Sequence, residues 1–176
     1  MELYVARHGE TAWNRENRIC GRTDLPLTDR GRRQAEELAR SLAGLGIGLI
    51  LTSPLVRARE TAAAAAAVTG APVRTDPRLT EQNFGSFEGR ERSEAAWQAA
   101  KRQLACRYPG GESALDVAAR VYPLLEELRA APPAPTVLLV CHGGVCRVIR
   151  TYFRDMDTET FARYSPANCQ AERYLL

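Results

Sequence analysis

The stretch TVLLVC at residues 136–141, with HGG following at 142–144, decides the fold of this 176-residue chain. It is a continuous apolar run, which is typical of a strand that is covered on both faces of a sheet. The two glycines behind His142 predict a turn into a helix that runs through Phe153. A buried strand that leads directly into a helix indicates an α/β protein with a parallel sheet.

Other segments repeat this alternation of short apolar strands and helices. Thr28 is a good N-cap, and the apolar residues behind it recur at helical spacing until Gly44 and Gly46 end the helix. Ser53 and Pro54 predict the start of another helix, with Ser53 as its cap. The expected strands are residues 3–6, 49–52, 73–75, 136–141 and 172–175. Helices are expected to begin at residues 28 and 143 and to span about residues 53–69, 91–107 and 113–129. Residues 9–27 and 79–87 are expected to form loops.

This order of elements predicts a three-layer α/β/α sandwich with a mostly parallel central sheet. No internal repeat and no linker divides the chain, so we expect a single domain over residues 1–176. With 45% hydrophobic residues, the chain can bury a full core without disulfides or a structural metal. Ligands of such sheets bind beyond the carboxyl ends of the strands, which places the expected site at that edge.

The composition excludes several classes of protein. With 24 Lys and Arg against 21 Asp and Glu, the net charge of +3 argues against a nucleic-acid partner. Lys101 is the only lysine, and the many arginines suit phosphate, although a GC-rich genome would produce the same bias. The five cysteines form no framework, no secretory signal follows Met1, and the uncharged stretch Thr61–Val73 is too short to cross a membrane. We therefore expect a cytoplasmic protein with reduced thiols and no membrane partner.

The two histidines occupy equivalent positions in this scheme. His8, preceded by Arg7, follows the strand at residues 3–6, and His142 follows the strand at residues 136–141. Parallel strands bring such ends to one edge of the sheet, so the two imidazoles are expected to meet. A single histidine would favour a structural role; because both histidines of the chain lie at strand ends, the balance shifts towards a site.

The surrounding residues fit phosphoryl transfer. A neutral imidazole can attack phosphorus and form a phosphohistidine, and the transferred group needs positive charge around it. Arg7 is adjacent to His8, while Arg57 and Arg59 lie in the first turn of the helix behind Pro54. Of these two, Arg59 fits the surface of that helix better. The cations are expected to lower the pKa of His8 and to keep it neutral.

An ordered set of motifs then carries a resemblance that spans the chain to about Arg147. The sequence resembles the histidine phosphatase superfamily, whose members are phosphoglycerate-mutase-like proteins. The matching stretches are Leu3–Asn14 (LYVARHGETAWN), Gly21, Asp24–Thr28, Gly31, Gln34–Ala35, Ser53–Leu55, Arg57–Ala58, Glu60–Ala62, Leu79–Glu81, Phe84–Gly85, Phe87–Gly89, Pro109–Ser113, His142–Val145 and Arg147.

The resemblance implies a role for each matching residue. His8 would be the phosphorylated nucleophile, and Glu81 would be the general acid that protonates the leaving oxygen and then activates water. Without the family, Glu81 would be read as a solvated carboxylate. The residues implied to bind the phosphate or the substrate are Arg7, Arg57, His142, Asn14 and the backbone of Gly143.

Several neighbouring residues are less clearly placed. Cys20 precedes Gly21 where many relatives carry Ser or Thr, and a thiol is a poorer donor to a substrate. Arg22 and Arg92, together with Arg90, are candidate substrate-side arginines whose alternative is a solvated surface position. Glu10 can equally orient the loop, and Trp13, Trp97 and the tyrosines fit packing. No carboxylate or further histidine joins Cys141, His142 and Cys146, so no metal and no cofactor is expected.

The family divides into mutases and phosphatases. The mutases insert a longer segment after the loop of Glu81, whereas residues 93–108 are short and Pro109–Gly111 follows at once. Without such a lid water should reach the phosphohistidine, which favours a phosphomonoesterase acting on a small phosphorylated metabolite. The Glu81–Gly89 stretch is similar to α-ribazole phosphatases and to broad-specificity sugar and organic-acid phosphatases. A mutase, a phosphoprotein phosphatase and a phospholigand-binding pseudoenzyme remain alternatives, and a homodimer is one assembly left open.

Overall fold

A mixed five-stranded sheet forms the centre of the protein in a computed structural model that describes residues 1–176. Its order is β3-β2-β4-β1-β5. The strands β1 to β4 pair in parallel, and β5 pairs antiparallel with β1 at one edge. The mostly parallel sheet predicted from the sequence is therefore confirmed, with strands β1 (Glu2–Arg7), β2 (Leu49–Thr52), β3 (Val73–Thr75), β4 (Thr136–Cys141) and β5 (Ala171–Leu175).

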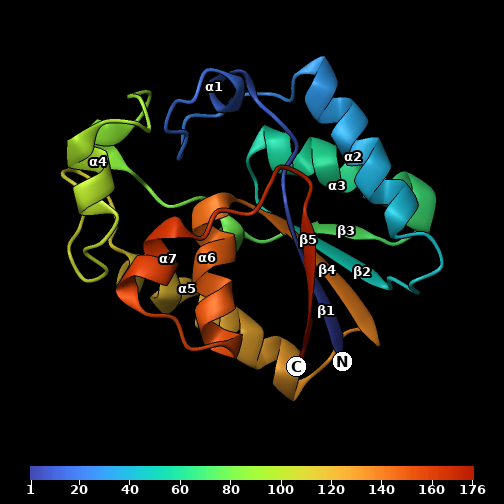
Figure 1. Cartoon of the computed structure of the whole chain (residues 1–176). Helices are drawn as coiled ribbons and strands as arrows, with labels where there is room; N and C mark the ends of the chain where they lie inside the picture. The colour runs from blue at the N-terminus through green and yellow to red at the C-terminus, as the bar shows by residue number, and fades with distance from the viewer.

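Helices cover both faces of this sheet (Figure 1). The helices α2 (Asp29–Ser41) and α3 (Val56–Thr69) pack on one face. The helices α5 (Ala114–Ala130) and α6 (Gly143–Phe153) pack on the other. This is the α/β fold with helical layers on either side that the alternation of elements predicts. No helix has both the length and the apolar character that a membrane crossing requires.

The central strand β4 divides the core in two. Its side chains alternate, so Leu138 and Val140 join the cluster under α2 and α3, while Val137, Leu139 and Cys141 join the larger cluster under α5 and α6. All of β4 is buried. A fully buried aliphatic side chain stabilises a fold by roughly 1.5–3 kcal/mol, so a strand with apolar residues on both faces anchors both helical layers.

Several helix boundaries agree with the expected signals. Thr28 caps α2 by accepting from the N–H of Gly31, and Ser113 caps α5 in a capping box with Asp116. Gly70 ends α3 in the left-handed region, with φ at 70°. Ser53, however, does not cap α3: the N-cap is Leu55, whose side chain forms no capping bond, and the N–H of Val56 donates to the carboxylate of Asp24 at 2.8 Å.

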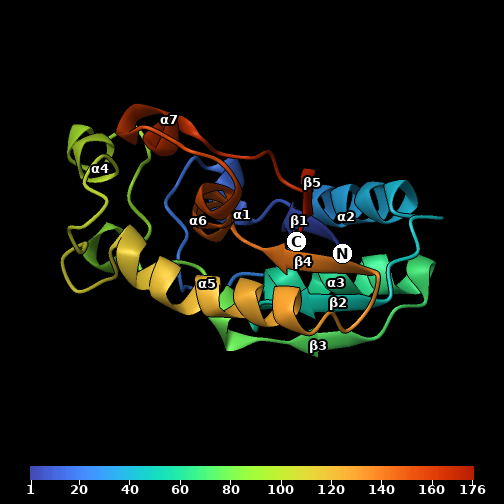
Figure 2. The same cartoon turned by 90° about the horizontal axis from the view of Figure 1, so that it is seen from below.

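Other expectations need correction. The helix expected over 91–107 is only α4 (Ala95–Ala100), since the flanking residues form turns. Within the expected loops lie α1 (Ala12–Arg15), which Thr11 caps, and two short 3-10 helices at Pro77–Leu79 and Gly85–Phe87. The helix α7 (Thr158–Arg163), begun by Asp157, was not predicted. Figure 2 shows α4 and α7 together at one end of the molecule, where Arg102 forms an ion pair with Glu159.

Candidate active site

The carboxyl ends of β1 and β4 bring the two histidines together. The strands pair in parallel with Arg7 opposite Cys141, so the next residue of each strand is a histidine. The ring centroids of His8 and His142 lie 5.0 Å apart. Both side chains are buried. The meeting of the two imidazoles, inferred from strand topology, is what the structure shows.

Hydrogen bonding defines the protonation of His8. Its Nδ1 lies 2.6 Å from the carbonyl oxygen of Gly9, which can only accept, so Nδ1 carries the proton. The Nε2 atom is therefore the unprotonated nitrogen. Burial, with the nearby charges of Arg57 and Arg7, lowers the pKa of His8 well below its usual value of 6.5. His8 is a neutral imidazole with a lone pair on Nε2 near neutral pH.

Arg57 brings a buried positive charge to His8. Its Nε donates to Nε2 of His8 at 3.2 Å, and its terminal nitrogens donate to the carbonyl oxygens of Thr23 and Gly21 at 2.9 and 2.6 Å. The side chain is fully buried and has no carboxylate partner. Arg57 thus fastens the loop at 21–23 with one edge of its guanidinium and faces the nucleophile with the other.

Arg7 supplies a second charge from the strand that carries His8. Its Nη1 donates to the carbonyl of Pro166 at 2.7 Å, while its buried Nε has no partner in the protein. Burial, together with the charge of Arg92, lowers the pKa of Arg7 to about 10. A buried donor without an acceptor costs about 1–3 kcal/mol, so this atom is suited to an anionic ligand.

The imidazole of His142 is held by Ser53, which the sequence predicts to be the N-cap of α3. Its Nε2 lies 2.7 Å from Oγ of Ser53, and Ser53 also accepts from the N–H of Leu55. The buried Nδ1 of His142 has no partner in the protein. Burial, then the charge of Arg57, lowers the pKa of His142 well below 6.5. Ser53 therefore orients the imidazole instead of capping α3.

Glu81 approaches the same place from the other side of the cavity. Its Oε2 accepts from the N–H of Gly144 at 3.1 Å, and its Oε1 accepts from the N–H of Gln82 at 2.8 Å. The side chain is buried. These bonds fix the carboxyl group beside the N-terminus of α6. The N–H of Gly143, at the first position of that helix, has no intrahelical acceptor and is free for a ligand.

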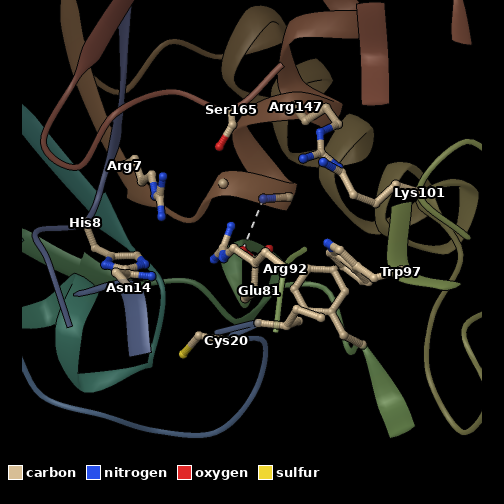
Figure 3. Close-up of a pocket in the computed structure, with 14 residues that line it drawn as sticks. Arg7, His8, Asn14, Cys20, Glu81, Arg92, Trp97, Lys101, Arg147 and Ser165 are labelled. Atoms are coloured by element: carbon tan, nitrogen blue, oxygen red, sulfur yellow. Dashed lines mark hydrogen bonds between the residues drawn. The ribbon is translucent and has the colours of Figure 1, made fainter. Parts of the chain in front are cut away.

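His8, Arg7, Glu81 and Gly143 line one small cavity, of about 30 Å³ (Figure 3). Arg57, which donates to Nε2 of His8, and His142, which lies beside the ring of His8, are not among its lining residues. The close-up places His8, Arg7 and Asn14 at one end, and Lys101, Trp97 and Arg147 at the other, with Glu81 and Arg92 between them. The lining residues are Arg7, His8, Asn14, Ile19, Cys20, Glu81, Phe84, Arg92, Trp97, Lys101, Gly143, Gly144, Arg147 and Ser165.

Two of the residues expected to bind substrate lie outside this cavity. The guanidinium of Arg22 is occupied, because it donates to Glu112 at 2.9 Å and to the carbonyl of Glu81 at 3.4 Å. Gly21 offers its carbonyl to Arg57, and a Cβ on it would come within 2.0 Å of Glu88. Arg22 therefore supports the loop that carries Glu81 from outside the cavity, and its contact with a substrate stays a prediction.

Other neighbours resolve into structural and cavity-lining roles. The carboxylate of Glu10 accepts from the hydroxyl of Thr28 at 2.9 Å, so Glu10 orients its loop. Arg59 is exposed on α3. Cys20 lines the cavity. Its thiol lies 3.8 Å from the carbonyl oxygen of Thr23, and a thiol is a weak hydrogen-bond donor. No group of three or more His, Cys, Asp or Glu side chains is arranged to hold a metal ion.

Several positioning residues were not predicted. The amide of Asn168 donates to the carbonyl of His8 at 2.9 Å and to Oδ1 of Asn14 at 3.3 Å. The hydroxyl of Thr61 accepts from the N–H of Gly9 at 3.1 Å. Asn168 lies 160 residues from His8 along the chain, so no local pattern could reveal the contact. Thr61 belongs to the matching stretch Glu60–Ala62, and its place in that family motif was the one indication in the sequence that it lies near the site.

A short cap covers the cavity, which corrects the expectation of an uncovered site. Trp97 of α4 stacks on Tyr108, with ring centroids 5.2 Å apart. Phe84 meets the edges of both rings, at 5.0 and 5.4 Å. This aromatic cluster, completed by Phe87, ties α4 to the loop that carries Glu81. A segment too short to match the mutase insertion therefore still closes over the site.

Known proteins place this arrangement in a family. A model of the histidine phosphatase superfamily (branch 1) matches residues 3–174. The chain is 36% identical over 183 aligned residues to a probable phosphoglycerate mutase GpmB of Cronobacter sakazakii, covering 98% of this chain and 84% of the relative. A protein with the same name from Escherichia fergusonii is 39% identical with the same coverage.

Solved structures agree. The mycobacterial glucosyl-3-phosphoglycerate phosphatase Rv2419c in its complex with VO3 matches with a TM-score of 0.87 and 33% identity, over 98% of this chain and 91% of that one. TTHB049 from Thermus thermophilus matches with a TM-score of 0.78 and 35% identity, over 98% and 92% of the chains. The fold, the paired histidines and these matches together show that the chain is an enzyme of the histidine phosphatase superfamily.

Proposed function

We propose that the protein is a phosphomonoesterase that hydrolyses a small phosphorylated metabolite through a phosphohistidine on His8. The observation that carries this proposal is one cavity lined by a neutral imidazole and a fixed carboxyl group, His8 and Glu81, among arginines without acidic partners. A nucleophile and a separate proton donor facing one space are what a two-step phosphoryl transfer requires.

In the first step, Nε2 of His8 attacks phosphorus and the bond to the ester oxygen breaks. The leaving oxygen takes a proton from Glu81, which requires Glu81 to enter the step protonated. Arg57 now donates to Nε2 of His8, and its Nε passes to a phosphoryl oxygen once the P–N bond forms. The unpartnered Nε of Arg7 and the free N–H of Gly143 are further donors for the phosphoryl oxygens.

In the second step, Glu81 acts as base and removes a proton from water. The water oxygen bonds to phosphorus, the P–N bond breaks, and His8 returns to its neutral form with inorganic phosphate released. The charge of the bound phosphoryl group is compensated by Arg7 and Arg57, and the neutral imidazole of His142 lies beside His8 as a further hydrogen-bonding group. Asn14 lines the same end of the cavity and is held by Asn168, so its amide is placed to contact the phosphoryl group or the substrate.

The size of the cavity favours a small substrate over a phosphoprotein. A volume of about 30 Å³ under the aromatic cap does not admit a protein surface. A phosphoglycerate mutase is the second candidate, favoured by the names of the relatives. Retention of the full set of His8, Arg7, Arg57, Glu81 and His142 argues against a pseudoenzyme that only binds phosphorylated ligands.

The test is transfer of phosphate to His8. Incubation with a chromogenic phosphomonoester and rapid acid-free quenching should reveal protein heavier by one phosphoryl group, located on His8, with continuous release of inorganic phosphate. The variant His8→Ala should lose both. Turnover by His8→Ala at the rate of the wild type would refute the mechanism.

A second assay separates hydrolase from mutase. The enzyme is supplied with 3-phosphoglycerate and a trace of the bisphosphate, and both free phosphate and 2-phosphoglycerate are measured. Hydrolysis supports the proposal, whereas accumulation of 2-phosphoglycerate with little free phosphate would replace it by the mutase reaction. A panel with α-ribazole phosphate, sugar phosphates and phosphorylated organic acids then ranks substrates by kcat/KM.

A further inference from the structure

The end of the cavity opposite His8 carries two cations that the chemistry on His8 does not use. Lys101, the only lysine of the chain, follows α4, and Arg147 projects from α6. Figure 3 shows their charged groups side by side, with the hydroxyl of Ser165 pointing into the same space. Trp97 forms the apolar wall beside them.

Neither cation has an acidic partner. The ammonium group of Lys101 makes no hydrogen bond or ion pair within the protein, and Arg147 uses only its Nε, which donates to the carbonyl of Tyr164 at 3.0 Å. The cap otherwise pairs its exposed arginines: Arg102 binds Glu159, and Arg90 binds Glu94. Lys101 and Arg147, like Arg7 and Arg92 elsewhere in the cavity lining, therefore have no acidic partner, whereas the exposed Arg90 and Arg102 do.

Arg147 is also held rigidly. Its side chain is buried, and its guanidinium lies over the ring of Phe161 at 5.3 Å, so α7 fixes it from behind. Its terminal nitrogens are the donors that remain, and they point towards the cavity. A guanidinium with one edge anchored and its other donors free is preorganised for an oxyanion.

The proximity of the two charges is unfavourable without a ligand. Burial, with the charges of Arg147 and Arg92, lowers the pKa of Lys101 to about 8. Burial also lowers the pKa of Arg147. Buried charges are normally paired, so an anion between these groups would relieve both repulsion and desolvation. Glu81, the only carboxylate that lines the cavity, is bound by backbone N–H groups and does not pair with them.

We propose that Lys101 and Arg147 form a second oxyanion subsite, which binds a carboxylate or second phosphate of the same substrate molecule whose phosphoryl group is transferred to His8. This inference rests on the proposed function, and it narrows the substrate to phosphomonoesters with two anionic ends. Ser165 offers a further hydroxyl to that second group. Trp97 forms the apolar wall beside that second group, at the end of the cavity that carries Lys101 and Arg147.

The experiment compares substrates that differ only at the second end. Phosphorylated ω-hydroxy carboxylates of two, three and four carbons are each paired with the phosphorylated diol of equal length, and bisphosphates of the same diols form a third series. For the wild type, kcat/KM should favour the anionic member of at least one length by about 10- to 100-fold, the effect of one or two charge-assisted hydrogen bonds. The preferred series distinguishes a carboxylate from a second phosphate.

Variants assign the preference to the subsite. Lys101→Met, which keeps the length of the side chain and removes its charge, should reduce the ratio between anionic and neutral substrate by about 10-fold, and Lys101→Arg should restore most of it. Arg102→Met is the matched control, since Arg102 is the next residue, is exposed and pairs with Glu159. It should leave the ratio unchanged.

The outcomes separate this inference from the proposed function. Equal hydrolysis of anionic and neutral members, or a ratio that Lys101→Met does not change, would overturn the second subsite while the phosphatase stands. If no substrate is hydrolysed, non-hydrolysable phosphonate analogues are titrated by calorimetry. Tighter binding of the carboxylate-bearing phosphonate, lost in Lys101→Met, would then support the subsite although the phosphatase falls. Equal binding of both analogues would overturn the subsite as well.

Discussion

His8 owes its chemistry to a few atoms around one imidazole. The carbonyl of Gly9 holds the proton on Nδ1, and the charges of Arg57 and Arg7 oppose a second proton. A protonated imidazole has no lone pair with which to attack phosphorus. Gly9 therefore selects the tautomer, while burial and the charges of Arg57 and Arg7 lower the pKa of His8 and keep the nucleophile neutral at neutral pH.

The two buried histidines should make stability depend on pH. In the unfolded chain each histidine takes up a proton below about pH 6.5, whereas burial keeps His8 and His142 neutral in the folded state. The unfolded state binds more protons, so this stability is complete above pH 6.5 and is lost as the pH falls below it. Each histidine contributes a slope of about 1.4 kcal/mol per pH unit in that range.

Urea denaturation at several pH values between 7 and 5 measures this effect. Below pH 6.5 the free energy of unfolding of the variant His8→Gln should fall with decreasing pH by about 1.4 kcal/mol per pH unit less than that of the wild type, because the variant lacks one buried histidine. Carboxylates that titrate in the same range act on both proteins and cancel in the difference. Parallel curves for the two proteins would mean that His8 is protonated in the folded state.

Ser53 should affect the rate through His142. Ser53→Ala removes the hydroxyl that lies 2.7 Å from Nε2 of His142. We expect phosphorylation of His8 to slow by about 10-fold in rapid-quench experiments, the effect of about 1.4 kcal/mol. Thr52→Val is the control, because the Thr52 hydroxyl is buried one residue away and bonds only a backbone carbonyl. A variant that loses stability but keeps the wild-type rate would make Ser53 purely structural.

At the scale of elements, the strands and long helices follow from their own residues. The apolar run at 136–141 predicts a strand buried on both faces, and Thr28, Ser113 and Gly70 mark helix ends through hydrogen bonds or backbone angles of their own. The residues around α4 behave differently. Their composition is helical over 91–107, yet helix forms only at Ala95–Ala100, since packing of Trp97 into the aromatic cluster governs that segment. Tertiary contacts of this kind have no local signature.

The loop of His8 depends on a close approach to α2. A Cβ added to Gly31 would lie 2.2 Å from the carbonyl oxygen of Glu10, a backbone atom that cannot move aside. Gly31→Ala should therefore cost roughly 2–3 kcal/mol in urea denaturation and displace the loop that follows His8. Gly44→Ala, where φ is 78° and the space is empty, should cost only about 1 kcal/mol. If Gly31→Ala cost no more than Gly44→Ala, the contact with Glu10 would not be what restricts position 31.

For the molecule as a whole, topology explains why the central chemistry was visible in the sequence and its surroundings were not. His8 and His142 could be paired because each follows a strand of a parallel sheet, and Glu81 could be assigned only through the family motif. Lys101 and Asn168 reach the site from distant segments, Lys101 by way of the cap. The ion pair of Arg22 could not be predicted, because nothing local reveals its partner Glu112, which lies 90 residues away. The strands of a parallel sheet place the residues that follow them at one edge, so those neighbours can be predicted from the sequence, whereas the neighbours of loop residues cannot.

The aromatic cap has a consequence for turnover. Trp97 and Lys101 bring α4 and the residue after it to the wall of the cavity, so we expect α4 to shift when a substrate enters or a product leaves. Trp97 lies at the centre of that movement and is one of only two tryptophans, which makes its fluorescence an intrinsic optical reporter. Stopped-flow mixing with vanadate, in a Trp13→Phe background, should give a fluorescence change whose rate levels off at high vanadate concentration. We expect that plateau to report the rate at which α4 moves, a step that can limit kcat however fast the chemistry on His8 becomes.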